Sequence, residues 1–500
     1  MSRTFVFNGW AADESMWSQC SFRRDRVFTY LEHLAGESLA AVAAEPDGVV
    51  LVGFSMGGTV ALEAALKFPE KIRALVLVSA TARMMEARDD AGAVVWKGMS
   101  LRRRAALKYG TVLMNRGNSS PLFADAALDR GLDYLQQTDL RARLDAIAGA
   151  TRFPVVILQG DRDGIVRPPN ADFLARIFPQ AAVTIVPGGE HDLPRLAPET
   201  IDRAVAGMQK CAAKLPRGLI EVSNRCAKNC SYCGIRRDAA NLPRYHLSEA
   251  EVLECAREAV RRGYPAIALQ AGEIESEANT AFYERVLGAL GELDAAAGRP
   301  LEVTLSLGEQ SEAVYRRWRA AAGARTLRYL LRIETSNREL YAKLHPADHS
   351  FERRRECIRT LKRLGYVTGS GVMIGLPGQS AADLERDLDF FEAERLDMVG
   401  MGPYVEAPGT PLAAESARLK AAGDARWWSE RDRFEKTLWM IRETRRRLPH
   451  VNIVAATALE ALDPDGRAKG FASGANVYMP NLTPAAARVN YTLYHNKEKL

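Results

Sequence analysis

The sequence lacks the features that mark membrane and nucleic-acid-binding proteins. No apolar run reaches the ~18 residues of a membrane-spanning helix. The first residues run directly into a strand pattern, so we expect no signal peptide. The net charge is only +6 over 500 residues, and no nucleic-acid-binding motif accompanies the short arginine runs. We therefore expect neither a membrane nor a nucleic-acid partner.

Cysteine is also scarce, with seven residues in the chain, three of them clustered, which is not the pattern of a disulfide framework. A reducing cytoplasm is the compartment that we expect. The hydrophobic content of 47% and the charged content of 26% are typical of a globular protein. A chain of 500 residues is too long for one ordinary core, so two domains are expected.

The three clustered cysteines are Cys226, Cys230 and Cys233, in a C-x3-C-x2-C pattern with Tyr232 before the last. Three thiolates from one loop can hold three irons of a 4Fe-4S cluster and leave the fourth iron free to take a small molecule. A structural zinc site is the alternative, but it would need a fourth Cys or His nearby, and the next histidine, His246, lies beyond a polar loop. The pattern favours the cluster.

This spacing resembles that of the radical S-adenosylmethionine (SAM) enzymes. The resemblance implies that the amino and carboxylate groups of SAM chelate the open iron. It also implies that an electron from the cluster cleaves SAM to a 5′-deoxyadenosyl radical, with a ferredoxin or flavodoxin as electron donor. The expected cofactors are therefore a 4Fe-4S cluster and SAM.

The N-terminal part alternates strand and helix patterns, which predicts an α/β fold with a parallel sheet. Apolar strands are predicted at 4–10, 48–54 and 74–79, with a helical pattern at 59–68. Between the second strand and this helix lies Gly53-Phe-Ser55-Met-Gly57, the G-x-S-x-G pattern of a nucleophile elbow.

A serine nucleophile needs a base and an acid later in the chain. Asp163 and His191 each follow an apolar strand, in the order Ser, Asp, His. Over about residues 3–208 the chain resembles the α/β-hydrolase family, especially carboxylesterases of the pimeloyl-carrier-protein methyl ester type (BioH-like). The resemblance implies a triad of Ser55, Asp163 and His191, with an oxyanion hole formed by the N–H groups of Trp10 and Met56.

Several positions depart from that family. Two strands that usually precede the first strand are missing, so we expect about six strands, and Asn8 stands where many relatives have histidine. Residues 84–145 are predicted to form a helical cap. The basic cap residues Arg102–Arg104 and Lys108 either contact an acidic carrier protein or form a solvated helix face.

The chain changes pattern after His191. We predict the hydrolase domain over residues 1–210, a linker over 211–218 marked by Pro and Gly, and a (β/α)8 TIM barrel over 219–500. The barrel's eight strands are predicted at 219–223, 266–270, 301–306, 329–334, 368–375, 398–402, 451–456 and 475–480. Polar and glycine residues gather at their carboxyl ends, where barrel enzymes place their chemistry.

The strand ends resemble the HydE-type radical SAM maturase of FeFe-hydrogenase over nearly all of residues 218–495. Motifs that carry this resemblance include Leu269-Gln-Ala-Gly-Glu, Leu305-Ser-Leu-Gly-Glu, Leu344-His-Pro and Gly474-Ala-Asn-Val-Tyr-Met-Pro-Asn. HydE is related to biotin synthase and to a mutase that makes methylornithine. The extra barrel cysteines of biotin synthase are missing, since Cys255 and Cys357 lie in helical patterns and are interpreted as packing positions. Biotin-type sulfur insertion is therefore disfavoured.

The resemblance also implies roles for single residues. Glu334 would accept a hydrogen bond from SAM, and Arg354 would bind its carboxylate in a bidentate manner. Arg332 and Thr457 would face the substrate, with Tyr491 or Tyr494 beside it. Ala456 replaces one of two consecutive threonines of the family, so substrate binding can differ there. The full set implied for SAM is Tyr232, Gln270, Glu273, Glu334, Arg354 and Met373.

Together these patterns predict a bifunctional fusion of a HydE-type radical SAM enzyme with a serine carboxylesterase. The substrate of the barrel would be a small organometallic or sulfur-bearing molecule, and a carrier protein or other maturases would be further partners. Three alternatives stay open: a biotin-pathway fusion, a mutase of the methylornithine type, and a hydrolase domain that serves only as a binding module.

Overall fold

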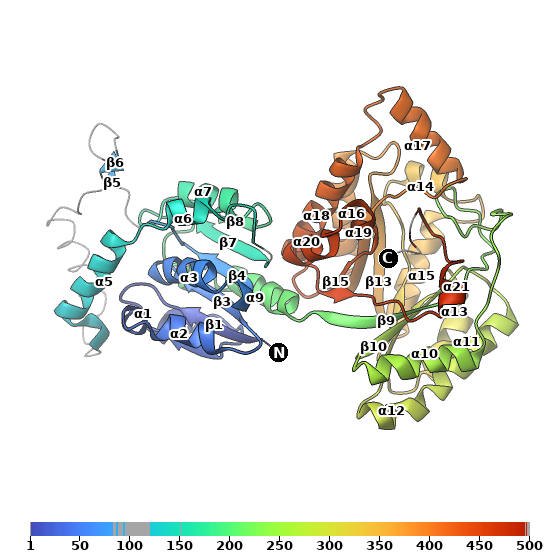
Figure 1. The fold of residues 1–500 in the computed structure, drawn as a ribbon, viewed down its shortest axis with the longest axis horizontal. Helices are drawn as coiled ribbons and strands as arrows, with labels where there is room; N and C mark the ends of the chain where they lie inside the picture. Colours follow the sequence, from blue (N-terminus) through green and yellow to red (C-terminus); the bar gives the residue numbers. More distant parts are fainter. Residues whose placement is uncertain are drawn as a thin grey trace. The chain divides into compact units, whose positions relative to one another are not determined.

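The computed structural model describes residues 2–83, 87–88, 94–95, 121–151, 153–495 and 497. It divides into two compact units, which are Met1–Ala213 with Phe471–Gly474, and Lys214–Gly470 with Ala475–Leu500 (Figure 1). Among the described residues, no helix is both long and apolar enough to cross a membrane.

The first unit is built on a parallel sheet of six strands, as predicted, in the order β2-β1-β3-β4-β7-β8. Its strands are β1 (Arg3–Phe7), β2 (Arg26–Phe28), β3 (Val49–Phe54), β4 (Ile72–Val78), β7 (Val155–Gly160) and β8 (Ala182–Val186). The sequence analysis missed β2, because three residues at the edge of a sheet are too few to show a period-two pattern.

Helices cover both faces of this sheet. They are η1 (Glu14–Trp17), α1 (Tyr30–Leu34), α2 (Glu37–Ala44), α3 (Met56–Lys67), η2 (Pro69–Lys71), α7 (Pro169–Ile177), α8 (Leu193–Leu196) and α9 (Pro198–Ala212). Alternate residues of each strand point to opposite faces. Phe5 and Phe7 pack with α2, α3 and α7, whereas Val6 packs with η1 and α9. Ser55, in the predicted elbow between β3 and α3, therefore lies at the edge of a sheet that is buried on both faces.

The predicted cap over 84–145 is described in part. Its described elements are the paired strands β5 (Ala87–Arg88) and β6 (Val94–Val95), η3 (Pro121–Phe123), α5 (Asp125–Gln137) and α6 (Arg141–Asp145). Helix α5 packs Leu128 and Leu132 inward. The basic residues Arg102–Arg104 and Lys108 lie outside the described residues.

The second unit is a closed barrel of eight parallel strands, as the sequence predicts. The strands are β9 (Leu215–Ser223), β10 (Ala266–Ala271), β11 (Glu302–Ser306), β12 (Leu327–Leu330), β13 (Val367–Ile374), β14 (Met398–Pro403), β15 (Asn452–Ala455) and β16 (Val477–Tyr478). Strand β16 pairs with β9 and closes the ring.

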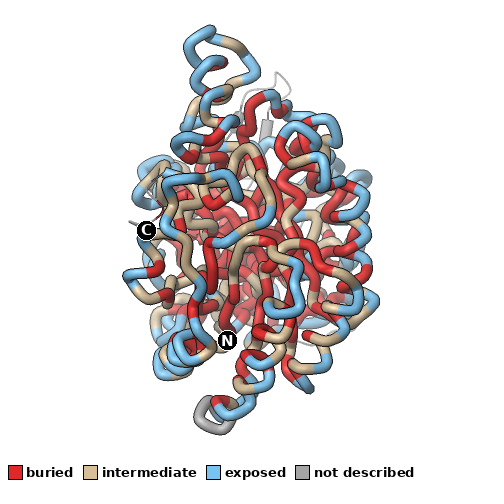
Figure 2. Tube along the Cα trace, turned by 90° about the vertical axis from the view of Figure 1, so that its right-hand side faces the viewer, coloured by how far each residue is buried: buried red, intermediate tan, exposed pale blue. Residues whose placement is uncertain are grey.

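Helices surround the barrel. They are α10 (Glu249–Arg261), α11 (Glu277–Ala289), α12 (Gly291–Ala297), α13 (Glu312–Ala321), α14 (Arg338–Leu344), α15 (Phe351–Arg363), α16 (Ala381–Ala393), α17 (Pro411–Ala421), α18 (Glu430–Arg447), α19 (Ala458–Leu462), α20 (Gly466–Ala472) and α21 (Ala485–Arg488). Several begin with a side-chain cap, such as the capping box of Ser248 and Glu251 at α10. Buried segments gather inside the barrel, and exposed segments lie on the helices around it (Figure 2).

The structure corrects two boundaries. The predicted linker 211–218 is wrong, because α9 continues to Ala212 and β9 begins at Leu215. Pro216 is tolerated because it lies near the beginning of its strand. The predicted strand 329–334 ends instead at Leu330, and a loop follows in which Glu334 adopts a left-handed backbone with φ of 61°.

Candidate functional sites

The nucleophile elbow connects β3 to α3. Ser55 has φ of 54° and ψ of −120°, which is a strained backbone for a residue with a side chain. A Cβ atom at Gly57 would lie 2.0 Å from the Phe7 carbonyl oxygen, and one at Gly53 would lie 2.6 Å from the Gly57 oxygen. Both glycines are therefore required for this turn to form.

The structure brings Ser55, His191 and Asp163 together, although Ser55 and His191 lie 136 residues apart in the sequence. His191 Nε2 lies 2.9 Å from Ser55 Oγ. His191 Nδ1 lies 3.1 Å and 3.0 Å from the two carboxylate oxygens of Asp163. Such a chain can accept the serine proton at Nε2 while the carboxylate fixes the imidazole tautomer.

Asp163 is buried, and its surroundings favour the ionised form. Burial alone raises the pKa of this carboxyl, but the hydrogen bond and charge of His191, together with the backbone donors of Val166 and Ile165, outweigh burial and the pKa is lowered overall. The N–H groups of Ile165 and Val166 each donate to Asp163 Oδ1 at 2.9 Å. The acid of the predicted triad is therefore held as a carboxylate.

The predicted oxyanion hole lies beside the serine. Met56 is the first residue of α3, so its N–H is one of the donors that a helix leaves without an intrahelical acceptor. A Cβ atom at Gly9 would lie 3.0 Å from Ser55 Cβ, which places the chain before Trp10 against the nucleophile. The Trp10 indole donates to the Leu128 carbonyl of α5 at 3.1 Å, so the same residue also binds the cap.

Asn8, which stands where many relatives have histidine, forms hydrogen bonds within the core. It is fully buried, and its side-chain oxygen accepts a hydrogen bond from the Trp17 indole at 2.5 Å. The backbone N–H of Asn8 donates to Phe28 of β2.

A cavity of about 360 Å³ opens inside the barrel. It is lined by residues from the ends of several strands, as expected for a barrel enzyme. Among its lining residues are the three clustered cysteines and every residue predicted to bind SAM or substrate, namely Cys226, Cys230, Cys233, Tyr232, Gln270, Glu273, Glu334, Arg354, Met373, Arg332, Thr457, Tyr491 and Tyr494. The structure thus gathers residues that are spread over about 270 positions of the sequence.

The cysteine loop is anchored on three sides. Ser231 N–H donates to Leu344 at the end of α14, and Ala227 N–H donates to Glu273 after β10, both at 2.8 Å. A Cβ atom at Gly234 would lie 1.9 Å from the Thr492 carbonyl oxygen, so only glycine fits there. The loop is therefore fixed against the cavity.

The three thiols fit the attachment of an iron–sulfur cluster. Burial raises the pKa of all three thiols. The pKa of Cys233 rises to about 12. Such thiols would stay protonated in the protein alone, whereas coordination to a metal deprotonates them. All three thiols face one cavity. Three ligands bind three irons of a 4Fe-4S cluster and leave the fourth iron without a protein ligand.

Two of the predicted SAM ligands form ion pairs within the protein. Glu334 accepts hydrogen bonds from Arg332, with Arg332 Nε at 2.8 Å and Nη2 at 2.7 Å. Arg354 Nε donates to Glu309 at 2.7 Å, and Arg354 Nη1 donates to the Arg332 carbonyl at 3.0 Å. Both arginines are therefore already oriented by the barrel.

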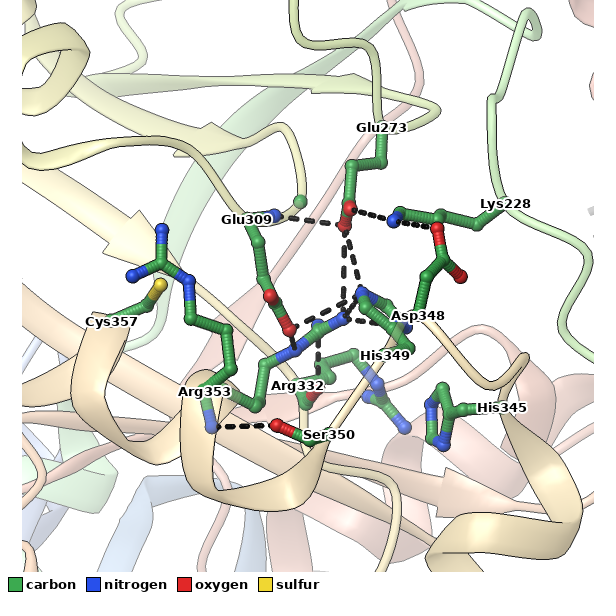
Figure 3. A network of polar contacts seen from close by, with 12 residues as sticks. Lys228, Glu273, Glu309, Arg332, His345, Asp348, His349, Ser350, Arg353 and Cys357 are labelled. Carbon is green, nitrogen blue, oxygen red and sulfur yellow. Dashed lines mark hydrogen bonds and ion pairs between the residues drawn. The ribbon is translucent and has the colours of Figure 1, made fainter.

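A wider polar network joins Glu309, Glu273 and Lys228 (Figure 3). Glu273 accepts from the Glu309 N–H at 2.8 Å and lies 3.7 Å from Lys228 Nζ. Lys228 in turn contacts Asp348 at 2.6 Å. Sequence analysis quoted Glu309 within a motif without assigning it a role, and it missed Lys228, which lies between two of the cysteines.

Two histidines also approach the cysteine loop. Ligand atoms of Cys230, His345 and His349 lie within 4.8 Å of one another, and all three residues are buried. The expectation that a zinc ligand lies near the cysteines in sequence does not cover these histidines, because no spacing rule joins residue 230 to residue 349. Only the Leu344-His-Pro motif gave a signal for His345.

The far wall of the cavity comes from the C-terminal segment. Thr457 and Tyr494 share a hydrogen bond of 2.7 Å between their hydroxyl oxygens. Tyr491 is buried, and the Lys497 ammonium forms an ion pair with Glu221 of β9. Lys497 is a further cavity residue that sequence analysis missed.

Comparisons with known proteins agree with this division. The Radical SAM superfamily model matches residues 220–391, and the Alpha/beta hydrolase family model matches residues 17–204. The [FeFe] hydrogenase maturase subunit HydE of Thermotoga maritima is 44% identical over 281 residues, which are 56% of this chain and 74% of that protein.

A pimeloyl-[acyl-carrier protein] methyl ester esterase of Xanthomonas campestris pv. campestris is 31% identical over 175 residues, which are 31% of this chain and 67% of that protein. A similar esterase of Aromatoleum aromaticum is 31% identical, and the match spans 64% of its length. The crystal structure of methylornithine synthase (PylB) matches with a TM-score of 0.45 and 23% identity, over 56% of this chain and 77% of that one.

Proposed function

This chain belongs to the radical SAM superfamily through its barrel, in the branch of HydE, and to the α/β hydrolase family through its N-terminal unit, and on that basis we propose an enzyme with two activities. The barrel cleaves SAM reductively and acts on a small organometallic or sulfur-bearing substrate. The N-terminal unit hydrolyses a carboxylic ester.

The proposal for the barrel rests on the cavity that joins Cys226, Cys230 and Cys233 to the predicted SAM and substrate residues. A 4Fe-4S cluster with SAM supplies the electron transfer and radical chemistry of this superfamily when both are bound. The three thiolates would hold the cluster. Glu273 and Glu334 offer carboxylates to the ammonium and hydroxyl groups of SAM, and the closed wall keeps water from the reacting groups.

Binding of SAM would bring a new partner to Arg354 and leave Arg332 in place. Arg354 has Glu309 as its partner, and its guanidinium can also reach a ligand carboxylate in the same cavity. Arg332 is held between Glu334 and the carbonyl of Gly400 at 2.9 Å, so it presents a fixed positive charge to the substrate. Thr457 adds a hydroxyl that Tyr494 orients.

In the hydrolase unit, Ser55 Oγ attacks the ester carbonyl while His191 Nε2 takes the serine proton. Asp163 keeps His191 in the tautomer that has a free Nε2. The N–H groups of Met56 and Trp10 bind the developing oxyanion. The esterase relatives act, by their names, on a carrier-protein methyl ester, and we propose a carrier-linked or free carboxylic ester for this unit.

A crossed pair of variants tests this proposal. Cys226→Ala in protein reconstituted with iron and sulfide abolishes formation of 5′-deoxyadenosine but leaves hydrolysis of p-nitrophenyl esters intact. Ser55→Ala has the opposite effect. Cys255→Ala is the matched control, because Cys255 is buried in α10 and does not line the cavity. Deoxyadenosine formation at the normal rate in Cys226→Ala would rule out the cluster assignment.

A second experiment separates an esterase from a hydrolase unit that only binds a partner. The geometry of Ser55 and His191 favours the esterase, because only a serine activated by a base reacts with a fluorophosphonate. We expect labelling of the intact chain and no labelling of Ser55→Ala. An unlabelled wild-type chain would leave binding as the role of this unit.

A further inference from the structure

We propose that the cluster-free chain binds a single divalent ion of the zinc class through Cys230, His345 and His349. The ion and the 4Fe-4S cluster exclude one another, because both require Cys230. This inference rests on the proposed function only in assigning Cys230 to the cluster.

The three residues come from three segments that the barrel brings together. Cys230 lies in the loop after β9, His345 follows the last residue of α14, and His349 precedes α15. One ligand atom from each lies within 4.8 Å of the others, and all three residues are buried. Zinc–sulfur and zinc–nitrogen bonds of about 2.3 Å and 2.0 Å place the donor atoms of a tetrahedral site roughly 3.3–3.6 Å apart, so the three side chains must close in around the ion when it binds.

His345 is held in an orientation that suits a metal ligand. Its Nδ1 lies 2.9 Å from the Tyr341 carbonyl oxygen, to which it donates, so Nε2 carries the free lone pair. Its ring also stacks on Tyr341 at a centroid distance of 4.0 Å. A backbone carbonyl on the second ring nitrogen is the usual outer partner of a metal-bound histidine. Tyr232 is a further neighbour, with its hydroxyl 3.4 Å from His345 Nε2.

His349 has two carboxylates as partners, where His345 has a backbone carbonyl. Its Nε2 lies 3.3 Å from a carboxylate oxygen of Glu273 and 3.2 Å from one of Glu309. Once Arg354 has moved away from this ring, Nε2 can donate to these carboxylates and leave Nδ1 to bind the ion, which gives the carboxylate–histidine–metal arrangement. Arg354 Nη2 also contacts this ring, at 2.5 Å from Nε2 and 3.3 Å from Nδ1. Because a guanidinium only donates, the arginine must give up its contact with Nε2 when the ion binds.

The charges around the site suit a divalent cation. A Cys230 thiolate with the carboxylates of Glu273 and Glu309 gives three negative charges, and Arg354 gives one positive charge. These four groups together carry a net charge of two negative units, which balances the two positive charges of the ion. Lys228 and Asp348, which form their own ion pair beside the site, cancel each other. A buried ion is tolerated where its charge is balanced in this way.

An ion at this site changes how the cluster assembles. With Cys230 bound to the ion, only Cys226 and Cys233 are left for iron, and two thiolates from this loop cannot hold three irons. Zinc in the cluster-free chain therefore delays the installation of the cluster, and incoming iron must displace it.

Cobalt(II) is the probe, because it replaces zinc in tetrahedral sites and absorbs visible light. It is added to the full-length chain purified without iron. The variant Cys226→Ser/Cys233→Ser retains the proposed site and removes the other thiols. We expect one cobalt per chain with a sulfur-to-metal band in this variant, and about a 100-fold loss of affinity in His345→Ala and in His349→Ala. His450→Ala, which alters an exposed histidine, is the control.

Three outcomes would overturn the inference. The first is the loss of cobalt binding in Cys226→Ser/Cys233→Ser, which would indicate a three-cysteine site. The second is unchanged affinity in both histidine variants. The third is a sulfur-to-metal band that persists in Cys230→Ser. Far-UV circular dichroism of each variant identifies any that has not folded, and His345→Gln and His349→Gln then replace it.

Reconstitution separates this inference from the proposed function. Wild-type chain is treated with iron and sulfide, with and without one equivalent of zinc, and its iron content and absorbance are followed over time. We expect zinc to slow cluster formation in the wild type more than in His349→Ala. A cluster that forms equally fast with zinc refutes the ion site alone, whereas a chain that never forms a cluster refutes the proposed function.

Discussion

The two units assemble their candidate sites in different ways. In the hydrolase unit, Ser55, His191 and Asp163 form one chain of hydrogen bonds, and each member has the partner that its chemistry requires. In the barrel, charged side chains around the cavity pair with one another, as Arg354 does with Glu309. The first site can act with its own side chains, whereas the second binds groups that the protein does not contain.

The largest expected effect tests whether the hydrolase chain acts as one unit. Asp163→Asn keeps the size of the side chain but favours the wrong tautomer of His191, so we expect ester hydrolysis to fall about 10³- to 10⁴-fold in kcat. Turnover of a p-nitrophenyl ester by the full-length chain measures this loss. The barrel should retain its full capacity to bind SAM.

Asp161→Asn is the matched control, because Asp161 lies two residues away and is exposed. Its hydrolysis should stay close to that of the wild type. If Asp161→Asn lost as much activity as Asp163→Asn, the acid of the triad would be misassigned.

The second expected effect concerns the stability of the barrel. Arg354→Met removes the permanently charged partner of the buried Glu309 carboxylate and leaves the His349 ring beside it, and breaking a buried pair in this way costs about 3–5 kcal/mol. Thermal unfolding followed by circular dichroism should therefore show an earlier transition for the barrel. The hydrolase transition, identified by the temperature at which ester hydrolysis is lost, should not move.

The double variant Glu309→Gln/Arg354→Met shows whether the loss comes from the unpaired charge. We expect it to recover part of the stability, because no carboxylate then stays buried alone at that position. Arg353→Met, which alters the neighbouring and more exposed arginine, should cost little. Equal losses in Arg353→Met and Arg354→Met would contradict the assigned role of the pair.

The hydrolase site was largely predictable from the sequence. The elbow is a five-residue motif whose glycines meet a steric demand, and Ser55 adopts the strained backbone that the motif requires. Asp163 and His191 each follow a buried strand, and parallel strands bring their carboxyl ends to one edge of the sheet. Strand β2 was missed because a short edge strand carries little apolar periodicity.

The barrel was predictable in its strands and less so in its contacts. All eight strands were found, but the loop after β12 was predicted as strand, because the apolar residues around Arg332 suggest a continuing pattern. Pro216 and Gly218 suggested a linker although they lie in β9. The approach of His349 to Cys230 depends on how two loops fold over the cavity, and no local pattern encodes it.

A third prediction compares two buried aspartates, one in each unit. Burial raises the pKa of Asp387 in α16 from 3.8 to about 7, and Asp387 accepts one backbone hydrogen bond, from the Ser336 N–H at 2.6 Å. Its second oxygen has no partner among the described residues. Asp163, which has His191 beside it, keeps a lowered pKa instead. Similar burial thus has opposite results in the two units.

The sign of the pH effect follows from this difference. Between pH ~4 and ~7 the folded barrel holds a proton on Asp387 that the unfolded chain has lost, so this group makes the barrel less stable as the pH rises. Asp387→Asn keeps an acceptor for Ser336 and removes the charge. We expect it to stabilise the barrel by about 2 kcal/mol at pH 8 and by much less toward pH 4.

Thermal unfolding at pH 5 and pH 8 measures this gain. Asp389→Asn is the control, because Asp389 lies on the exposed side of the same helix and pairs with Arg447. It should change stability by no more than about 0.5 kcal/mol at either pH. A gain for Asp387→Asn that is equal at both pH values would contradict the protonation of this carboxyl.

The smallest expected effect concerns the contact between the hydrolase site and its cap. The Trp10 indole donates to the Leu128 carbonyl of α5, while the backbone N–H of Trp10 is assigned to the oxyanion hole. Trp10→Phe removes the indole donor and keeps the backbone donor, so only the positioning of the cap changes. One lost hydrogen bond is worth about 1 kcal/mol, or roughly a fivefold lower kcat/KM for the ester.

The size of that loss distinguishes the two roles of Trp10. A fall of a few-fold is expected if the indole only positions α5, because the oxyanion donors and the triad are unchanged. Tyr30→Phe is the matched control. The Tyr30 hydroxyl also donates a hydrogen bond to the cap, at the Leu122 carbonyl, but it does not adjoin the serine. A loss of about 100-fold or more in Trp10→Phe alone would place the indole in the chemistry of the site, because removal of an oxyanion donor has effects of that size. The hydrolase site would then depend on its cap, as the barrel site depends on its cofactors.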